Sequence, residues 1–199
     1  SSAAADVYKR QAQHSPSLRD IAAKVADVQV RNRGTIGGAI AHADPAGDMS
    51  AGLIAAKGVV TVQGPSGRRN LSADEFFVDA YTTELSDDEI LVEFRFPAVG
   101  TTSGQAYEKI ANRASHFAVV GVAAVVEVGA AGSVKQIDLG ITGAGYKPTR
   151  AHKSEKALLG MDPSDEAIHT ASKLATDGIE CIEDMTTSDG EILLSLIHI

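Results

Sequence analysis

The chain has 199 residues, 44% of them hydrophobic and 22% charged, which suffices for one good core or for two small domains packed together. No apolar run approaches the roughly 18 to 20 residues that span a bilayer, so we expect no membrane insertion. Eighteen Lys and Arg against 26 Asp and Glu give a net charge of −8, a balance that disfavours nucleic acid as a partner.

Both ends of the sequence differ in character from the rest. The chain starts without an initiating Met, and residues 193–199 form an apolar string where polar sequence is expected. We therefore expect residues 1–14 and 192–199 to be tails that are non-native or disordered.

The first predicted element is a helix that opens at Ser15-Pro16, where a capping residue precedes a proline in the first helical position. It should end near Asp27. A short strand, Val28–Val30, is expected next, leading into a glycine-rich loop over residues 34–38.

A second helix is predicted from Asp48, a residue that can cap a helix whose apolar positions share one face. The β-branched run 59–62 then predicts a strand that ends at the Gly-Pro-Ser-Gly turn of residues 64–67. Ser72 followed three residues later by Glu75 forms a capping box, which predicts a short helix.

Four further strands are predicted from residue 90 onward. Every second position from Ile90 to Phe96 is apolar, which indicates a strand that Pro97 stops. A domain boundary is expected around residues 99–104. Three further strands are predicted at 105–111, 118–128 and 133–142. The tight turn at residues 129–132 should join the last two as an antiparallel hairpin.

Two helices are predicted in the last part of the chain. One should run from Ala151 to Leu159. The other should open at Asp162-Pro163 and close at Gly178, the residue type that most often ends a helix.

The cysteine and histidine content of the chain limits which disulfides and metal sites are possible. Cys181 is the only cysteine, so it has no internal disulfide partner, and no signal-peptide pattern is visible. A reducing, cytoplasmic setting is therefore expected. The six histidines are scattered without the spacing of a known metal site, so we predict no metal in this chain.

The most informative stretch is the loop of residues 31–38, RNRGTIGG. Adjacent glycines let backbone N–H groups approach an anion closely and converge on it, as at many diphosphate sites. Their spacing departs from the Rossmann fingerprint, which disfavours a nicotinamide dinucleotide. On spacing alone the glycines could equally make only a tight turn.

Residues 29–48, QVRNRGTIGGAIAHADPAGD, resemble the second flavin-binding segment of the FAD-binding medium subunits of molybdenum hydroxylases, the carbon monoxide dehydrogenase and xanthine dehydrogenase family. Further stretches agree in order and spacing. They are Asp88-Glu89-Ile90-Leu91, the run AYEKIANRASHFAVVGVAA from Ala106, and residues 138–151, which end in KPTRA. The resemblance covers roughly residues 15–191.

This resemblance implies an α+β fold. Residues 15–99 would be the second half of the FAD-binding domain, a mixed sheet with helices, and residues 104–191 a C-terminal domain of a small antiparallel sheet plus helices. The first FAD subdomain of the family, which carries another glycine-rich stretch, is not represented.

The resemblance also implies FAD-contacting residues: Thr35, Ile36, Gly37, Gly38, Ala39, Asp48, Leu91 and Lys109. Asp48 would lie near the sugar-like chain of the flavin, although simple helix capping is the competing interpretation. Leu91 and Lys109 would flank the isoalloxazine ring, and a shift by one residue would put Glu108 in place of Lys109. His42 is expected to be a packed loop residue.

The arginines Arg31, Arg33 and Arg113 could hold phosphate or dock a partner subunit, but solvated surface positions are the more frequent case. The sequence shows no acid–base pair or activated nucleophile, so no catalytic side chain is predicted; the flavin would do the redox chemistry.

By resemblance, the function is that of an electron outlet. The molybdenum cofactor would lie in a large partner subunit and two [2Fe-2S] clusters in a small one, in a dimer of heterotrimers, with FAD in this chain passing electrons to an external acceptor. Two alternatives stay open: a non-redox nucleotide-binding regulatory module, and another FAD enzyme of the same fold, such as an aryl-alcohol oxidase.

Overall fold

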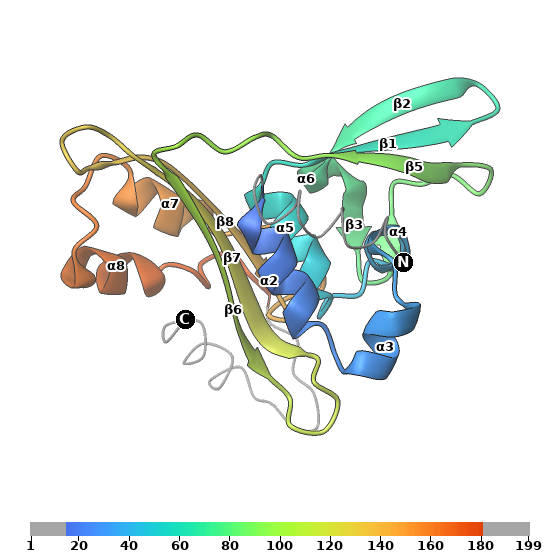
Figure 1. The fold of residues 1–199 in the computed structure, drawn as a ribbon, viewed down its shortest axis with the longest axis horizontal. Helices are drawn as coiled ribbons and strands as arrows, with labels where there is room; N and C mark the ends of the chain where they lie inside the picture. The colour runs from blue at the N-terminus through green and yellow to red at the C-terminus, as the bar shows by residue number, and fades with distance from the viewer. Residues whose placement is uncertain (1–14, 181–199) are drawn as a thin grey trace.

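A four-stranded antiparallel sheet forms the centre of this computed structural model, which describes residues 15–180 (Figure 1). Its strand order follows the sequence: β6 (Ser103–Ala111), β7 (Ala118–Val128), β8 (Val134–Thr142) and β9 (Thr149–Arg150). The three strands predicted here and the hairpin between the last two are confirmed. The α+β fold class is confirmed as well.

Helices cover both faces of this sheet, because successive side chains of a strand point to opposite sides. Ala123 and Val125 of β7 face α2 (Pro16–Lys24) and α5 (Asp48–Ala55). Val120 and Val122 face the opposite side, where α7 (His152–Leu158) and α8 (Asp165–Ser172) lie. Figure 1 shows the two helix pairs on either side of the sheet.

A glycine lets α5 rest directly on the sheet. A Cβ at Gly140 of β8 would lie 2.2 Å from the carbonyl oxygen of Ala51, a backbone atom in the middle of α5. No rotamer change can relieve a contact with backbone, so the helix itself would have to move.

Gly140→Ala is therefore expected to lower the free energy of unfolding by about 2–3 kcal/mol through overpacking. Gly104→Ala is the matched control, since Gly104 lies in β6 of the same sheet and has nothing within 4 Å of its Cβ position. The control should change stability by less than about 0.5 kcal/mol in urea unfolding. Equal effects of the two variants would contradict the proposed close packing.

A second sheet extends from this layered body (Figure 1). It has the order β2-β1-β5, with β1 (Val59–Gly64), β2 (Gly67–Ser72) and β5 (Ile90–Arg95). A small pair, β3 (Phe77–Asp79) and β4 (Thr82–Thr83), lies between them in sequence. Every strand pairing among the described residues is antiparallel, where a mixed sheet was expected for this half.

Local signals of this region match the structure. The turn at 64–67 joins β1 to β2, and Ser72 and Glu75 form the predicted capping box of α6 (Ala73–Phe76). Both bonds of the box are made, since Ser72 Oγ accepts from Glu75 N–H and the Glu75 carboxylate accepts from Ser72 N–H.

One ion pair holds β2 to the segment before β5. Arg69 donates from Nε and Nη2 to the two carboxylate oxygens of Glu89, at 2.7 and 2.6 Å, and Ser86 N–H adds a third bond at 3.0 Å. The Arg69 bonds are the main cause that lowers the pKa of Glu89 from 4.5 to about 2.

The Glu89 carboxylate should therefore titrate near pH 2 in carbon-detected NMR. Because its pKa is depressed in the fold, the pair stabilises the protein above pH 4.5 and this stabilisation is lost as the pH falls toward about 2. Arg69→Gln should return the midpoint toward 4.5. If Glu89 of the wild-type protein already titrated with a midpoint near 4.5, the ion pair with Arg69 would not form.

Three predictions about the first third of the chain are wrong. Residues 28–30 are not a strand but open α3 (Val28–Arg33), because the Asp27 carboxylate accepts from Val30 N–H at 2.9 Å and caps the helix. Gly34 is the C-cap of α3, and residues 36–38 are the first turn of α4 (Ile36–His42) instead of a loop. Gly47, not Asp48, is the N-cap of α5.

Three helix boundaries also differ from the prediction, among them the end of the last helix, which lies at Ser172 and not at Gly178. The first helix ends at Lys24, before Ala26, whose positive φ of 37° breaks the helical path. The last helix begins at Asp165, since Ser164 supplies the cap through a bond from Ala167 N–H to its hydroxyl.

The largest core spans the predicted boundary at residues 99–104. Ile21, Leu53 and Phe76 from the first half pack in one cluster with Tyr107 of β6 and Ala123 of β7. The predicted parts 15–99 and 104–191 therefore share a buried interior within the described residues. The predicted tails 1–14 and 192–199, and Cys181, lie outside the described residues. Among the residues described, none of the helices is both long and apolar enough to cross a membrane.

Candidate functional site

At the N-terminus of α4, two backbone N–H groups have no hydrogen-bond partner within residues 15–180. Thr35 caps the helix: its hydroxyl accepts from Gly38 N–H and its carbonyl from Ala39 N–H, both at 3.0 Å. The N–H groups of Ile36 and Gly37 are the remaining N-terminal donors of this helix. Together with the positive end of the helix dipole they favour an anion at this point.

The two adjacent glycines of this turn serve different purposes. A Cβ at Gly38 would lie 3.0 Å from Thr35 Oγ1, so Gly38 makes room for the cap. At Gly37, apart from its chain neighbours and the backbone of α4, no atom of residues 15–180 lies within 4 Å of the Cβ position. The surface above Gly37 is therefore open, and a ligand can approach its backbone closely.

A buried carboxylate lies at the start of the neighbouring helix. The Asp48 side chain is 6% exposed and accepts from the Tyr107 hydroxyl and from Lys109 Nζ, which lies 3.0 Å from Oδ1 and 3.1 Å from Oδ2. Burial raises the pKa of Asp48 above 3.8, while the bonds from Tyr107 and Lys109 oppose that rise. Burial and the nearby Asp48 charge raise the pKa of Tyr107.

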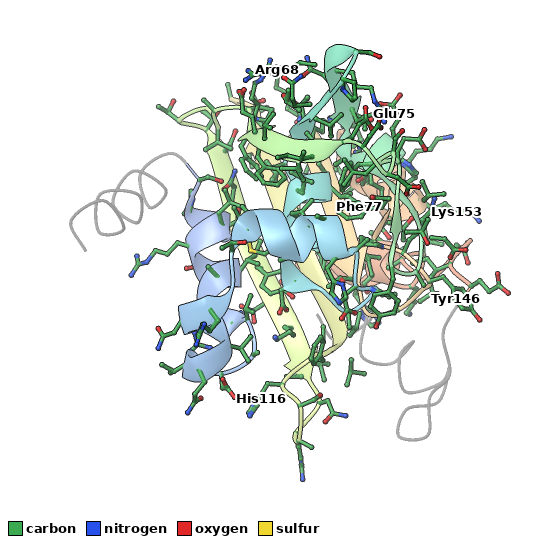
Figure 2. The ribbon with its side chains drawn as sticks, turned by 90° about the vertical axis from the view of Figure 1, so that its right-hand side faces the viewer. Arg68, Glu75, Phe77, His116, Tyr146 and Lys153 are labelled. Atoms are coloured by element: carbon green, nitrogen blue, oxygen red, sulfur yellow. The ribbon has the colours of Figure 1, made fainter. Side chains whose placement is uncertain are left out.

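Lys109 is surrounded by acceptors. Besides Asp48, its ammonium donates to the carbonyl oxygens of Lys24 at 2.6 Å and of His116 at 3.0 Å. The three N–H bonds of a lysine ammonium are thus all used. His116 belongs to the connection between β6 and β7, at one end of the sheet (Figure 2).

The alternation of β6 decides between the two candidate positions at 108 and 109. Tyr107 and Lys109 point to Asp48, whereas Glu108 points to solvent with 68% of its side chain exposed and pairs with Lys24 at 2.8 Å. The structure therefore brings Lys109, and not Glu108, together with Asp48.

The other predicted residues lie around α4. Leu91 of β5 is half-buried and packs, like Ile36, against the main core. Thr35 and Ala39 are exposed. Helix α4 packs against α5, which carries Asp48, and against β5, which carries Leu91.

Sequence reasoning missed Tyr107, although it lies two positions before Lys109 in a strand and therefore on the same face. His42 is the last residue of α4, exposed, with its ring 5.1 Å from that of Tyr81, so the prediction of a packed loop residue is wrong.

Of the three arginines, Arg31 donates to the carbonyl oxygens of Val25 and Ala26, at the C-terminal end of α2. Arg33 and Arg113 are exposed. Between residues 15 and 180 there is no group of three or more His, Cys, Asp or Glu side chains that could hold a metal ion.

Two protein-family models match the chain. The model described as the FAD binding domain in molybdopterin dehydrogenase matches residues 2–99. The model described as the CO dehydrogenase flavoprotein C-terminal domain matches residues 105–190. The glycine-rich turn and Asp48 lie in the first match, and Lys109 lies in the second.

Individual proteins agree with these models. The carbon monoxide dehydrogenase medium chain of Hydrogenophaga pseudoflava is 38% identical over 85% of this chain and 59% of its own length. The nicotine 6-hydroxylase medium subunit of Paenarthrobacter nicotinovorans is 33% identical over 87% of this chain and 60% of its own. This chain thus spans about three fifths of the length of these two relatives.

The fold agrees with a solved structure. Carbon monoxide dehydrogenase from Hydrogenophaga pseudoflava, in a form that lacks the Mo-pyranopterin moiety of the molybdenum cofactor, superposes with a TM-score of 0.90 at 37% identity. The match covers 94% of this chain and 65% of that one.

Proposed function

Because the chain belongs to the family of FAD-binding medium subunits of molybdenum hydroxylases, we propose that it is an FAD-binding electron-transfer subunit of such an enzyme. FAD, when bound, would supply the redox chemistry needed for electron transfer from iron–sulfur clusters to an external acceptor. The residues of this chain bind, orient and electrostatically tune that cofactor.

The observation that carries this proposal is the N-terminus of α4. Two N–H donors without a partner among the described residues, and the open surface over Gly37, lie in the segment that matches the FAD-binding domain model, and they suit a diphosphate. The residues that would hold it are Thr35, Ile36, Gly37, Gly38 and Ala39. The Thr35 hydroxyl accepts a bond in the cap but keeps its own hydrogen for a phosphate oxygen.

Three more residues would serve the rest of the cofactor. Asp48 would face the sugar-like chain, and Leu91 would provide an apolar wall that excludes water from the ring. Lys109 donates all three of its N–H bonds within the protein, so it would act on the flavin through its charge rather than through a direct bond. No catalytic side chain is assigned.

The partners follow from the names of the relatives, which are medium chains or subunits. We propose an iron–sulfur small subunit and a molybdenum-containing large subunit in a dimer of heterotrimers, located in the cytoplasm. The large subunit would determine the substrate.

A flavin titration tests the proposal. FAD is added to this chain joined to the first flavin-binding subdomain of the family, and binding is followed by flavin fluorescence, with ADP in a parallel titration. We expect FAD to bind at least about tenfold more tightly than ADP, a difference of about 1.4 kcal/mol from contacts with the flavin half. Absence of FAD binding, or equal affinity for both ligands, would favour the non-redox nucleotide-binding module instead.

A further inference from the structure

Tyr107 is a large buried side chain with a polar end inside the main core. It is 2% exposed and packs in the cluster formed by α2, α5 and the strands of both halves. Its hydroxyl donates to Asp48 Oδ1. A buried hydroxyl is unfavourable unless it is bonded, so phenylalanine would fill this place more simply if packing alone were required.

The neighbouring strand is shaped around this hydroxyl. A Cβ at Gly121 of β7 would lie 2.3 Å from Tyr107 Oη and 3.0 Å from its Cζ atom. Any other residue at position 121 would therefore displace the end of the phenol from Asp48. Gly121 and Tyr107 together define where the hydroxyl lies.

Lys24, the last residue of α2, contacts Tyr107 at its backbone and its ring. Lys24 Nζ donates to the backbone oxygen of Tyr107 at 2.5 Å and lies 5.6 Å from the centroid of its ring. The carbonyl of Lys24 accepts from Lys109. Tyr107 is thus fixed at its backbone, its ring and its hydroxyl.

We propose that Tyr107 is a positioning residue of the flavin site, whose hydroxyl, seated against Gly121, orients the Asp48 carboxylate for the cofactor. This inference rests on the proposed function, because it assumes that Asp48 serves bound FAD. Tyr107 itself would not touch the cofactor; it acts through Asp48.

The charges around Asp48 support this role. Tyr107 and Lys109 face the carboxylate from β6, and Lys24 of α2 lies behind Tyr107. Burial favours the neutral form of Asp48, and the Tyr107 hydroxyl is one of the groups that oppose this by lowering its pKa. Loss of the hydroxyl would therefore both release the carboxylate and raise its pKa further.

The test is Tyr107→Phe in the chain joined to the first subdomain, measured as FAD affinity between pH 4 and 8. We expect affinity to fall about tenfold at pH 7, as for loss of one bond to a charged group, and the acidic limb of the profile to move to higher pH. Thermal unfolding without FAD is recorded in parallel. Unchanged affinity and an unchanged profile, with or without a lower melting temperature, would reduce Tyr107 to a packing role and overturn the proposal.

Gly121→Ala provides a second variant. It should weaken FAD binding in wild-type background and have a smaller effect in Tyr107→Phe, where the atom nearest to the added methyl is missing. If Gly121→Ala weakened FAD binding equally in the wild type and in Tyr107→Phe, the proposed contact between the Tyr107 hydroxyl and Gly121 would be contradicted.

NMR titration of the Asp48 carboxyl without FAD tests the coupling between Tyr107 and Asp48 separately from FAD binding. A raised Asp48 pKa in Tyr107→Phe, in a protein that binds no FAD, would mean that the proposed function fails although the two residues are coupled. An unchanged Asp48 pKa would overturn the coupling itself.

Discussion

Gly37→Asp is expected to weaken FAD binding by at least about 100-fold, because a carboxylate about 4 Å from a diphosphate costs several kcal/mol at an effective dielectric constant near 20. The variant should still fold. Apart from the chain neighbours and the backbone of α4, no described residue lies within 4 Å of the added Cβ, and an acidic residue in the first turn of α4 interacts favourably with the helix dipole. The FAD affinity of the variant, measured by flavin fluorescence, should therefore fall while its thermal stability is unchanged.

Gly37→Asn is the matched control, since it has the same shape without the charge. Its affinity should lie between those of the wild type and Gly37→Asp, and the gap between the two variants should narrow as salt is added. Full FAD affinity in Gly37→Asp would show that no diphosphate lies over this turn.

Lys109→Met is expected to lower the free energy of unfolding by about 3–5 kcal/mol at pH 7, the range found when one partner of a buried ion pair is removed. Both side chains of this pair are nearly inaccessible, at 5% and 6% exposure, so solvent does not screen the Asp48 charge that remains. Urea unfolding of the chain measures the effect.

The pH dependence of this loss has a definite sign. The pKa of Asp48 is raised in the fold, so protonation in acid favours the folded state as the pH falls through that raised pKa toward 3.8. The penalty of Lys109→Met should therefore shrink on acidification. Lys135→Met removes an exposed pair with Glu127 in the same sheet and should cost no more than about 1 kcal/mol at any pH. Equal losses for both lysines would argue against a buried pair.

Features set by short-range rules could be predicted from the sequence. The Val-rich run 118–128 becomes β7, and the capping box of Ser72 and Glu75 opens α6. These signals depend on neighbours within a few residues, and nothing elsewhere in the fold opposes them. The strand predicted at residues 28–30 was wrong because the helix cap at Asp27 outweighs β propensity in a segment that has no strand partner.

The site was predictable only in part, because its contacts link distant segments. Asp48 and Lys109 were each identified by resemblance, but they are 61 positions apart, and no local pattern indicates that they form an ion pair. Tyr107 has its role only through Asp48 and Gly121, which α5 and β7 bring to it. The first turn of α4 was predicted as a loop, since two adjacent glycines in the first turn of a helix contradict intrinsic propensity.

The most direct test of the central claim follows the backbone amides of the α4 turn during an FAD titration, in the chain joined to the first subdomain. We predict that the ¹⁵N–¹H signals of Ile36 and Gly37 shift on FAD addition and saturate with the same midpoint as the flavin fluorescence. Saturating fluorescence with both amide signals unmoved would place the cofactor elsewhere and contradict the account.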